Sequence, residues 1–313
     1  MLRYKADRRT LGFVATYFAL VIVQWVYRPA ELWLAIPLFL ATCSFSWFCA
    51  VITHNAIHSA VFHKRWMNKA LQVVLSLTYG TPVSSYVSGH NLSHHRYTQE
   101  DRDLMRTTKV NYRWNWLNLF MFVPIVALAI PAGDARFARK MKNEKPRWYR
   151  QFLVESIATH GLTILLFIID WQAALIYWLL PHLWAAWGII AINFLQHDGC
   201  DQNSPYNHSR NFTGRFFGWW TFENGFHGIH HKHPNLHWSL AREAHNAEIA
   251  PFIHPALDQR SIAAYAFKTF IWPGRRVRYD GTPYVAPARV PDRSWMDEDR
   301  PDALPKDALG VES

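Results

Sequence analysis

Long apolar runs separated by short polar links dominate the pattern of this chain. Two runs follow each other near the N-terminus, at residues 11–27 and 32–52, and two more occupy residues 152–169 and 173–195. A helix needs roughly 20 apolar residues to cross a bilayer. The pattern therefore predicts four transmembrane helices, joined in pairs by tight turns on the far side of the membrane.

Two other apolar stretches are less regular. Residues 71–86 carry Pro82 and several hydroxyl groups, which favours a re-entrant or interfacial segment. Residues 114–130 are apolar enough to cross, but Pro124 interrupts them. A crossing there would also place the histidine clusters described below on opposite sides of the membrane. We therefore expect a shallow or re-entrant segment.

These elements predict an all-α integral membrane protein with about four transmembrane helices and a helical cap, formed by residues 199–278, on the cytoplasmic side. We assign residues 1–285 to one membrane domain. Residues 286–313 are polar, acidic and rich in proline, which is typical of a disordered tail.

Basic residues gather beside the apolar runs and predict the orientation. The segments 1–10, 63–69 and 136–150 are rich in lysine and arginine, so they should be cytoplasmic. The formal charge of +10 would suit nucleic acid, but the basic residues flank membrane runs and no nucleic-acid-binding motif occurs, so we exclude that class. Sixteen tryptophans fit membrane–water interfaces. We expect a multi-pass protein of a bacterial inner membrane whose first span is retained.

Three histidine clusters supply the candidate chemistry. Their spacings are H-x3-H, H-x3-H-H and H-x2-H-H in chain order. Neutral imidazole is a strong ligand for iron, zinc and copper, whereas a lone histidine is more often an ordinary polar residue. The clusters are His54 and His58, then His90, His94 and His95, then His227, His230 and His231.

The spacing within the clusters predicts how many ions they bind. Residues four apart share a face of an α-helix, because each residue turns the helix by about 100°. The first cluster has this spacing, as do His90 and His94, whereas His95 is rotated toward a second metal. The third cluster lies within one helical face. Eight imidazoles are too many for one ion and suit two.

The ligand types indicate which metal is bound. The clusters contain no cysteine, and the three cysteines of the chain form no Cys-x-x-Cys pair. Zinc usually takes four ligands. A set so rich in nitrogen, in a membrane, indicates redox iron, whose chemistry here would be oxygen activation and C–H cleavage.

In this order and with these gaps, the clusters resemble the three histidine boxes of the membrane fatty acid desaturase and hydroxylase superfamily, over about residues 32–255. The resemblance implies two iron ions held by all eight histidines on the cytoplasmic face, O2 as co-substrate, and a lipid or fatty acyl substrate. Members also carry a histidine after the last span, four residues beyond an asparagine that reaches the metal. Asn193 and His197 match this pattern and join the predicted ligands.

The boxes leave the reaction open. A fatty acyl desaturase is our first interpretation, and a hydroxylase or ketolase, or a decarboxylase that forms terminal alkenes, would use the same site. Residues 193–199 are also similar to membrane alkane hydroxylases. The alternative of a different class is a non-enzymatic membrane metal-binding protein. Its histidines should lie within the spans, whereas most of those here lie at span ends.

Side chains near the clusters are candidates for supporting roles. Carboxylates could orient the ligands by accepting the second ring N–H, and large rings near the third cluster could line a substrate tunnel, although tryptophan also anchors interfaces. The carboxylates are Asp101, Asp103, Asp198 and Glu223, and the rings are Trp219, Trp220, His237 and Trp238.

Electrons for this chemistry must come from another molecule. The sequence has no Gly-x-Gly-x-x-Gly motif and no His-Pro-Gly-Gly stretch, so we predict no bound flavin, NAD or heme. The basic cytoplasmic surface suits an acidic external electron donor such as ferredoxin.

Overall fold

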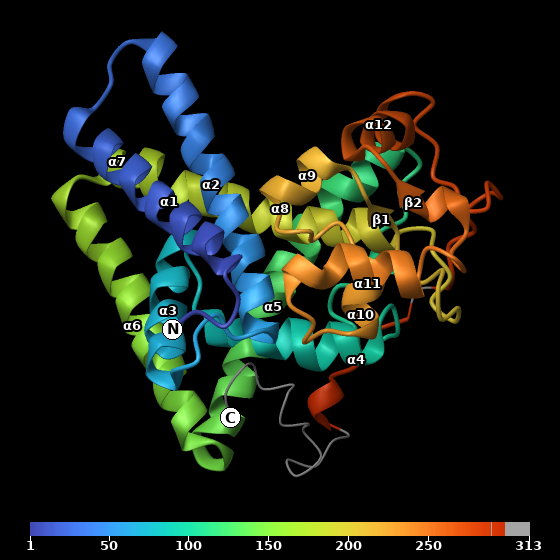
Figure 1. Ribbon diagram of the computed structural model, residues 1–313, viewed down its shortest axis with the longest axis horizontal. Helices are drawn as coiled ribbons and strands as arrows, with labels where there is room; N and C mark the ends of the chain where they lie inside the picture. The colour runs from blue at the N-terminus through green and yellow to red at the C-terminus, as the bar shows by residue number, and fades with distance from the viewer. Residues whose placement is uncertain (289, 298–313) are drawn as a thin grey trace. The chain divides into compact units, whose positions relative to one another are not determined.

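The computed structural model describes residues 1–288 and 290–297 and confirms the all-α architecture (Figure 1). Within these residues the only strands are β1 (Asn211–Phe212) and β2 (Asp258–Gln259), which pair in parallel. The chain forms two compact units. Unit 1 contains Met1–Val87 and Ala138–Ile189, and unit 2 contains Ser88–Phe137 and Ile190–Leu304.

Unit 1 is built mainly from the long apolar helices. In Figure 1, α1 and α2 run beside each other from the blue N-terminal end, joined by the short link that the sequence predicted. A second pair follows later in the chain, where α7 continues through a π-helical turn, η4, into α8. The helices are α1 (Asp7–Tyr27), α2 (Leu32–His58), α3 (Arg65–Tyr79), η1 (Val83–Ser85), α6 (Pro146–Ile169), α7 (Trp171–Ala174), η4 (Leu175–Leu179) and α8 (Leu180–His197).

The turns of the two pairs are tied together. Arg28 ends α1 in a left-handed conformation, with φ of 47°, and its guanidinium forms an ion pair with Asp170. The same carboxylate accepts hydrogen bonds from the backbone N–H of Gln172 and of Ala173, which caps α7. The α1–α2 turn and the start of α7 therefore lie at the same end of unit 1.

Five helices of the described chain are long and apolar enough to cross a membrane: α1, α2, α5 (Asn115–Glu144), α6 and the continuous helix 171–197. Large apolar side chains on them are exposed, with Val26 78%, Trp33 77% and Ile168 77% accessible. Large apolar side chains exposed along helices of this length suit a lipid environment. The break expected at Pro124 is not observed, because α5 continues through both Pro124 and Pro131.

Unit 2 combines the first part of α5 and the end of α8 with short helices. Its core, around α10 and α11, contains Phe226, Ile229, Ile249, Ile253 and Leu257. The remaining elements are η2 (Val87–His94), α4 (His95–Tyr97), η3 (Thr107–Lys109), α9 (Arg215–Trp220), α10 (His227–Lys232), η5 (Trp238–Leu240), α11 (Ala241–Glu248), η6 (Pro255–Leu257), α12 (Ile262–Ala266), η7 (Phe267–Ile271) and η8 (Trp295–Asp297).

Part of the segment predicted to be a disordered tail is packed instead. Trp295 is 3% exposed and contacts Phe137. Asp292 forms ion pairs with Arg106 and Lys109, at 2.9 and 2.8 Å. An acidic, proline-rich composition does not prevent order where a buried ring and paired charges hold the chain. Residues 289 and 298–313 of the predicted tail lie outside the described residues.

Candidate metal centre

Three helical segments of unit 2 bring histidines together. They are η2 with α4, the C-terminal end of α8, and α10. Four of these side chains form one group whose ligand nitrogens lie within 4.8 Å of one another. The group consists of His94, His197, His227 and His231.

The nitrogens of this group have the spacing of ligands on one ion. His227 Nε2 lies 2.8 Å from His197 Nε2 and 3.1 Å from His231 Nε2. Two nitrogens bound at roughly 2.1 Å to one ion, at right angles, would lie about 3.0 Å apart. Neutral imidazoles also gain little from turning acceptor nitrogens toward each other without a shared cation, so the donor set fits a metal.

The two ring nitrogens of His94 have different surroundings. Its Nδ1 lies 3.0 Å from Asp103 Oδ2, and since a carboxylate accepts, Nδ1 carries the proton. Its Nε2 is buried and has no hydrogen-bond partner. Leaving a buried polar atom unsatisfied costs about 1–3 kcal/mol. A lone pair held in this way, in a ring contacting His197 and His231, is oriented as a metal ligand.

His197 is oriented by the backbone. Its Nδ1 lies 3.1 Å from the carbonyl oxygen of His208. A carbonyl can only accept, so Nδ1 donates and Nε2 keeps its lone pair for the group. The identity of the side chain at position 208 does not predict this contact, because the acceptor is the backbone carbonyl.

A second set lies next to the first. His95 Nε2 is 3.0 Å from His90 Nε2 and 2.9 Å from His230 Nε2. The rings of His95 and His231 stack with centroids 4.5 Å apart, which joins the two sets within unit 2. The cluster histidines of unit 2 therefore form two adjacent sets.

The first cluster belongs to unit 1. His54 and His58 lie near the end of α2, both buried, with ring centroids 5.4 Å apart. The four-residue spacing on an α-helix therefore gives the shared face that the sequence predicted.

The division of the second and third clusters differs from the α-helical expectation. His90 and His94 were expected to share a metal, but His90 approaches His95, and His94 joins the other set. The reason is that Val87–His94 is a π-helix, whose wider turn brings residues five apart to one face. His230 likewise separates from His227 and His231.

Helix α10 is held by a chain of buried polar contacts. Asn211 Oδ1 accepts from the N–H of Gly228, at 2.9 Å, and Asn211 Nδ2 donates to Asp258, at 3.0 Å. His245 Nε2 lies 3.0 Å from the other oxygen of Asp258. The approach to α10 is equally tight, because a Cβ on Gly225 would clash with the carbonyl oxygen of Phe212. These contacts hold the start of α10, where His227 lies.

Burial favours the neutral form of His231 in the four-histidine group and of the neighbouring His208. Burial lowers the pKa of His231 well below its usual value, and the nearby His95 and His227 add to this effect. Burial, followed by the proximity of His94, lowers the pKa of His208 to about 4. At neutral pH both rings are uncharged, so protons do not compete with a cation for the ring nitrogens.

The family model for fatty acid desaturases matches residues 31–261 of this chain. The match covers most of the sequence, including the eight cluster histidines and His197. The protein belongs to the fatty acid desaturase family. None of the curated proteins compared with this chain matches it. Family membership and the five apolar helices together identify an integral membrane protein of the desaturase and hydroxylase type.

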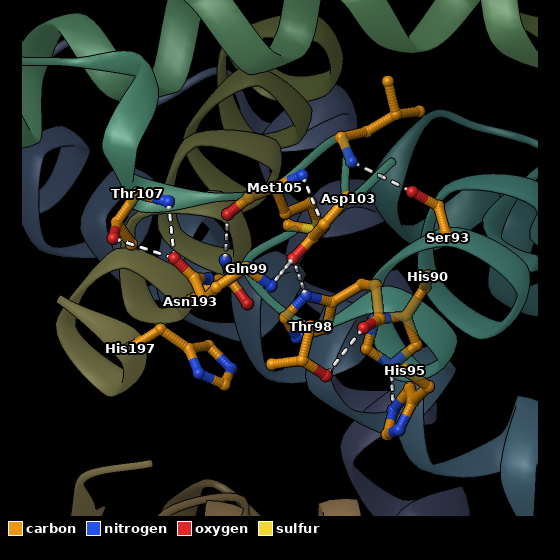
Figure 2. A network of polar contacts seen from close by, with 12 residues as sticks. His90, Ser93, His95, Thr98, Gln99, Asp103, Met105, Thr107, Asn193 and His197 are labelled. Carbon is orange, nitrogen blue, oxygen red and sulfur yellow. Dashed lines mark hydrogen bonds and ion pairs between the residues drawn. The ribbon is translucent and has the colours of Figure 1, made fainter. Parts of the chain in front are cut away.

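Within this desaturase-family protein, one of the four candidate carboxylates contacts a cluster histidine. Asp103 is fully buried and also accepts from the N–H groups of Gln99 and Met105, at 2.8 and 2.7 Å (Figure 2). The other three form ion pairs with arginines. These pairs are Asp101 with Arg293, Asp198 with Arg276, and Glu223 with Arg242.

Asn193, the expected asparagine, is buried near His197 (Figure 2). Its Nδ2 donates to the carbonyl oxygen of Met105, at 3.1 Å. The amide therefore holds the loop that contains Asp103.

The four candidate tunnel residues lie at the end of α9 and at the start of η5. Trp219 is 47% exposed and packs edge-on against Trp220. His237 is buried and forms a hydrogen bond with the Ser239 hydroxyl, at 2.8 Å. Trp238 packs edge-on against Phe222. Exposure of Trp219 on a short helix suits an interfacial anchor.

Proposed function

We propose that the protein is a di-iron membrane enzyme that uses O2 to oxidise an unactivated alkyl chain of a fatty acyl substrate, with desaturation as the reaction. The observation that carries this proposal is the four-histidine group, in which His94 presents a buried, unsatisfied Nε2 and is fixed from behind by Asp103. Membership of the desaturase family supports the choice of iron and of an acyl chain.

The ligands divide into two sets in this proposal. His94, His197, His227 and His231 hold one ion. The second ion is held by His90, His95 and His230, and we propose that His54 and His58 complete this set, as the box spacing and the family predict. Asn193 is proposed to lie beside the ions as a weaker oxygen ligand.

Bound iron would supply oxygen activation and the power to remove hydrogen from an unactivated carbon. The chain supplies orientation and exclusion of water. His94, His197 and His227 are 0%, 2% and 3% exposed, so their donor nitrogens lie in a largely dry environment. Asp103 and the His208 carbonyl fix the ring tautomers, so the nitrogens that face the ions are the unprotonated ones.

The proposal places this site at the cytoplasmic face of a bacterial inner membrane, reduced by an external donor such as ferredoxin. Purified protein in lipid nanodiscs should contain about two irons per chain, as two ligand sets require. With O2 and a chemical reductant, mass spectrometry should show loss of two hydrogens from an acyl substrate. Gain of one oxygen would identify a hydroxylase, and a shortened alkene a decarboxylase. Zinc alone, with no turnover after iron loading, would refute the enzyme.

Replacing either of two ligands tests the assignment. His94→Ala and His231→Ala should each lose about half of the bound iron, or all of it, together with activity, because binding requires the full ligand set. Both proteins should still insert into the membrane, since the apolar helices are unchanged. His160→Ala, an exposed histidine on α6, is the control and should keep its iron. Full activity in both ligand variants would contradict the assignment.

A further inference from the structure

A cavity of about 440 Å³ lies within unit 2 beside the candidate metal centre, and His197 forms part of its wall. Its lining has two chemical faces. Gln99, Arg106 and Arg278 contribute polar groups, and Val285, Ala288 and Val290 contribute aliphatic ones. A ligand that fits such a lining carries a polar group at one end and hydrocarbon next to it.

Two buried donors in this wall have no acceptor. Gln99 is 9% exposed and Arg106 is 8% exposed, and both Gln99 Nε2 and Arg106 Nε lack a hydrogen-bond partner. The orientation of the Gln99 amide is fixed, because its Oε1 accepts from Thr107 N and Thr107 Oγ1, at 2.8 and 2.9 Å (Figure 2). The NH2 group of Gln99 is therefore the part of the amide that is left to bind a ligand. An acceptor-rich ligand would remove the cost of leaving these donors unsatisfied.

The charge around the cavity favours an anion. In the described part of the chain, the acidic residue that lines the cavity is Asp101. Its carboxylate is paired with Arg293, at 2.6 Å. Asp292 is shared between Arg106 and Lys109. Arg106 uses Nη2 for these contacts, which leaves its Nε free for another acceptor. Arg278 adds a further positive charge.

We propose that this cavity binds the carboxylate of a fatty acid, with Arg106 and Gln99 as its donors and the first carbons of the chain lying against Val285 and Val290. That this fatty acid is the substrate of the enzyme rests on the proposed function. Because His197 lines the same cavity, the proposal places the carboxyl-proximal carbons beside one histidine of the candidate metal centre. Free fatty acids are then preferred over esters of equal chain length.

The loop that contains Asp103 connects the proposed carboxylate site to the candidate metal centre. Asp103 Oδ2 accepts both from His94 Nδ1 and from the N–H of Gln99. The donor that meets the carboxylate and the histidine that meets the metal therefore share one anchor, which keeps them in fixed register.

Equilibrium binding of laurate and of methyl laurate to the whole protein in nanodiscs tests the proposal. Laurate should bind at least about tenfold more tightly than its methyl ester, since hydrogen bonds to charged groups are stronger than neutral ones. Arg106→Gln should weaken laurate binding on the order of 10- to 100-fold and leave the ester unchanged.

Two further variants separate binding from folding. Gln99→Glu keeps the acceptor for Thr107 and replaces the free NH2 with a carboxylate oxygen, so it should also weaken laurate binding. Asp292→Asn breaks the same ion pair as Arg106→Gln but keeps the guanidinium, and it should retain laurate binding. Equal losses in Asp292→Asn and Arg106→Gln would show that only packing is involved and would overturn the proposal.

The remaining outcomes distinguish this inference from the proposed function. An iron enzyme that binds and oxidises laurate and methyl laurate equally, in both wild type and Arg106→Gln, would overturn the carboxylate site and leave the function standing. Arg106-dependent laurate binding in a protein without iron or oxygen-dependent turnover would support the site and refute the function. Inorganic phosphate that competes as strongly as laurate would identify a free-anion site and overturn the fatty acid assignment.

Discussion

At the scale of single residues, the site depends on how each imidazole is held from behind. Asp103 holds His94, and a backbone carbonyl holds His197. Groups of this kind set the tautomer, and with it the nitrogen that faces the ion. The three other carboxylates near the clusters serve the architecture, since each is paired with an arginine.

Asp103→Asn tests this orienting role. Asparagine keeps the size of the side chain but can present its NH2 to His94 Nδ1, which disfavours the tautomer that binds through Nε2. Iron affinity should fall about 10- to 100-fold, the usual effect of losing such a partner. Iron titration followed by metal analysis measures this. Asp101→Asn, on a carboxylate that pairs with Arg293, is the control and should bind iron normally.

At the scale of elements, the backbone geometry of short helices decides which histidines meet. The π-helix over Val87–His94 brings residues five apart together, so His90 approaches His95. Helix α10 has only six residues and cannot be stable alone. Its position depends on Asn211, Asp258 and His245, which come from β1, β2 and α11.

Asn211→Ala tests the anchoring of α10. The change leaves the N–H of Gly228 without its acceptor and Asp258 without one donor, so stability should fall by about 1–3 kcal/mol. Thermal unfolding in nanodiscs should show a lower midpoint, with weaker iron retention. Asn246→Ala, on the exposed side of α11, should change neither. An unchanged midpoint in Asn211→Ala would show that α10 is held by its core contacts alone.

At the scale of the whole molecule, the central question is whether α5 crosses the membrane. The Arg28–Asp170 pair puts the end of α6 beside the α1–α2 turn, so α6 must begin on the side where α2 ends. Between these points the chain contains α3, which has 15 residues and is short for a crossing, and α5. An even number of crossings is required there, so α5 should enter and leave on the same side despite its length.

Labelling of single cysteines tests this topology. In a background with the native cysteines replaced by serine, Ala30→Cys should react with a membrane-impermeant maleimide in intact cells. Arg113→Cys and Lys145→Cys, which flank α5 at exposed positions, should react only after permeabilisation. Reaction of just one of the two in intact cells would show that α5 crosses.

Basic residues lie at the junction of α5 and α6, and we propose that an acidic electron donor docks there. Replacing Lys140, Lys142 and Arg147 with glutamine should slow reduction by an acidic ferredoxin and flatten its dependence on ionic strength, because attraction of opposite charges speeds encounter. Stopped-flow reduction at several salt concentrations measures both. A matched variant at Arg3, Lys5 and Arg8 should behave as wild type. An unchanged salt dependence would exclude docking at this junction.

The sequence alone determined the elements and the ligand types. Apolar runs of membrane length fix α1, α2, α6 and the 171–197 helix, because only a helix satisfies its own backbone in lipid. Histidines at repeated short spacings indicate metal binding, because neutral imidazole is a strong ligand for transition metals. These features are local, and a linear pattern shows them directly.

The tertiary structure alone decided which histidine belongs to which set, which carboxylate supports a ligand, and where unsatisfied donors face a cavity. Asp103 and Asp198 are equally good candidates in sequence, yet one meets His94 and the other meets Arg276. Gln99 and Arg106 belong to no motif. Their roles arise from contacts between residues distant in the chain, whose energies depend on burial and geometry, and no local pattern records either.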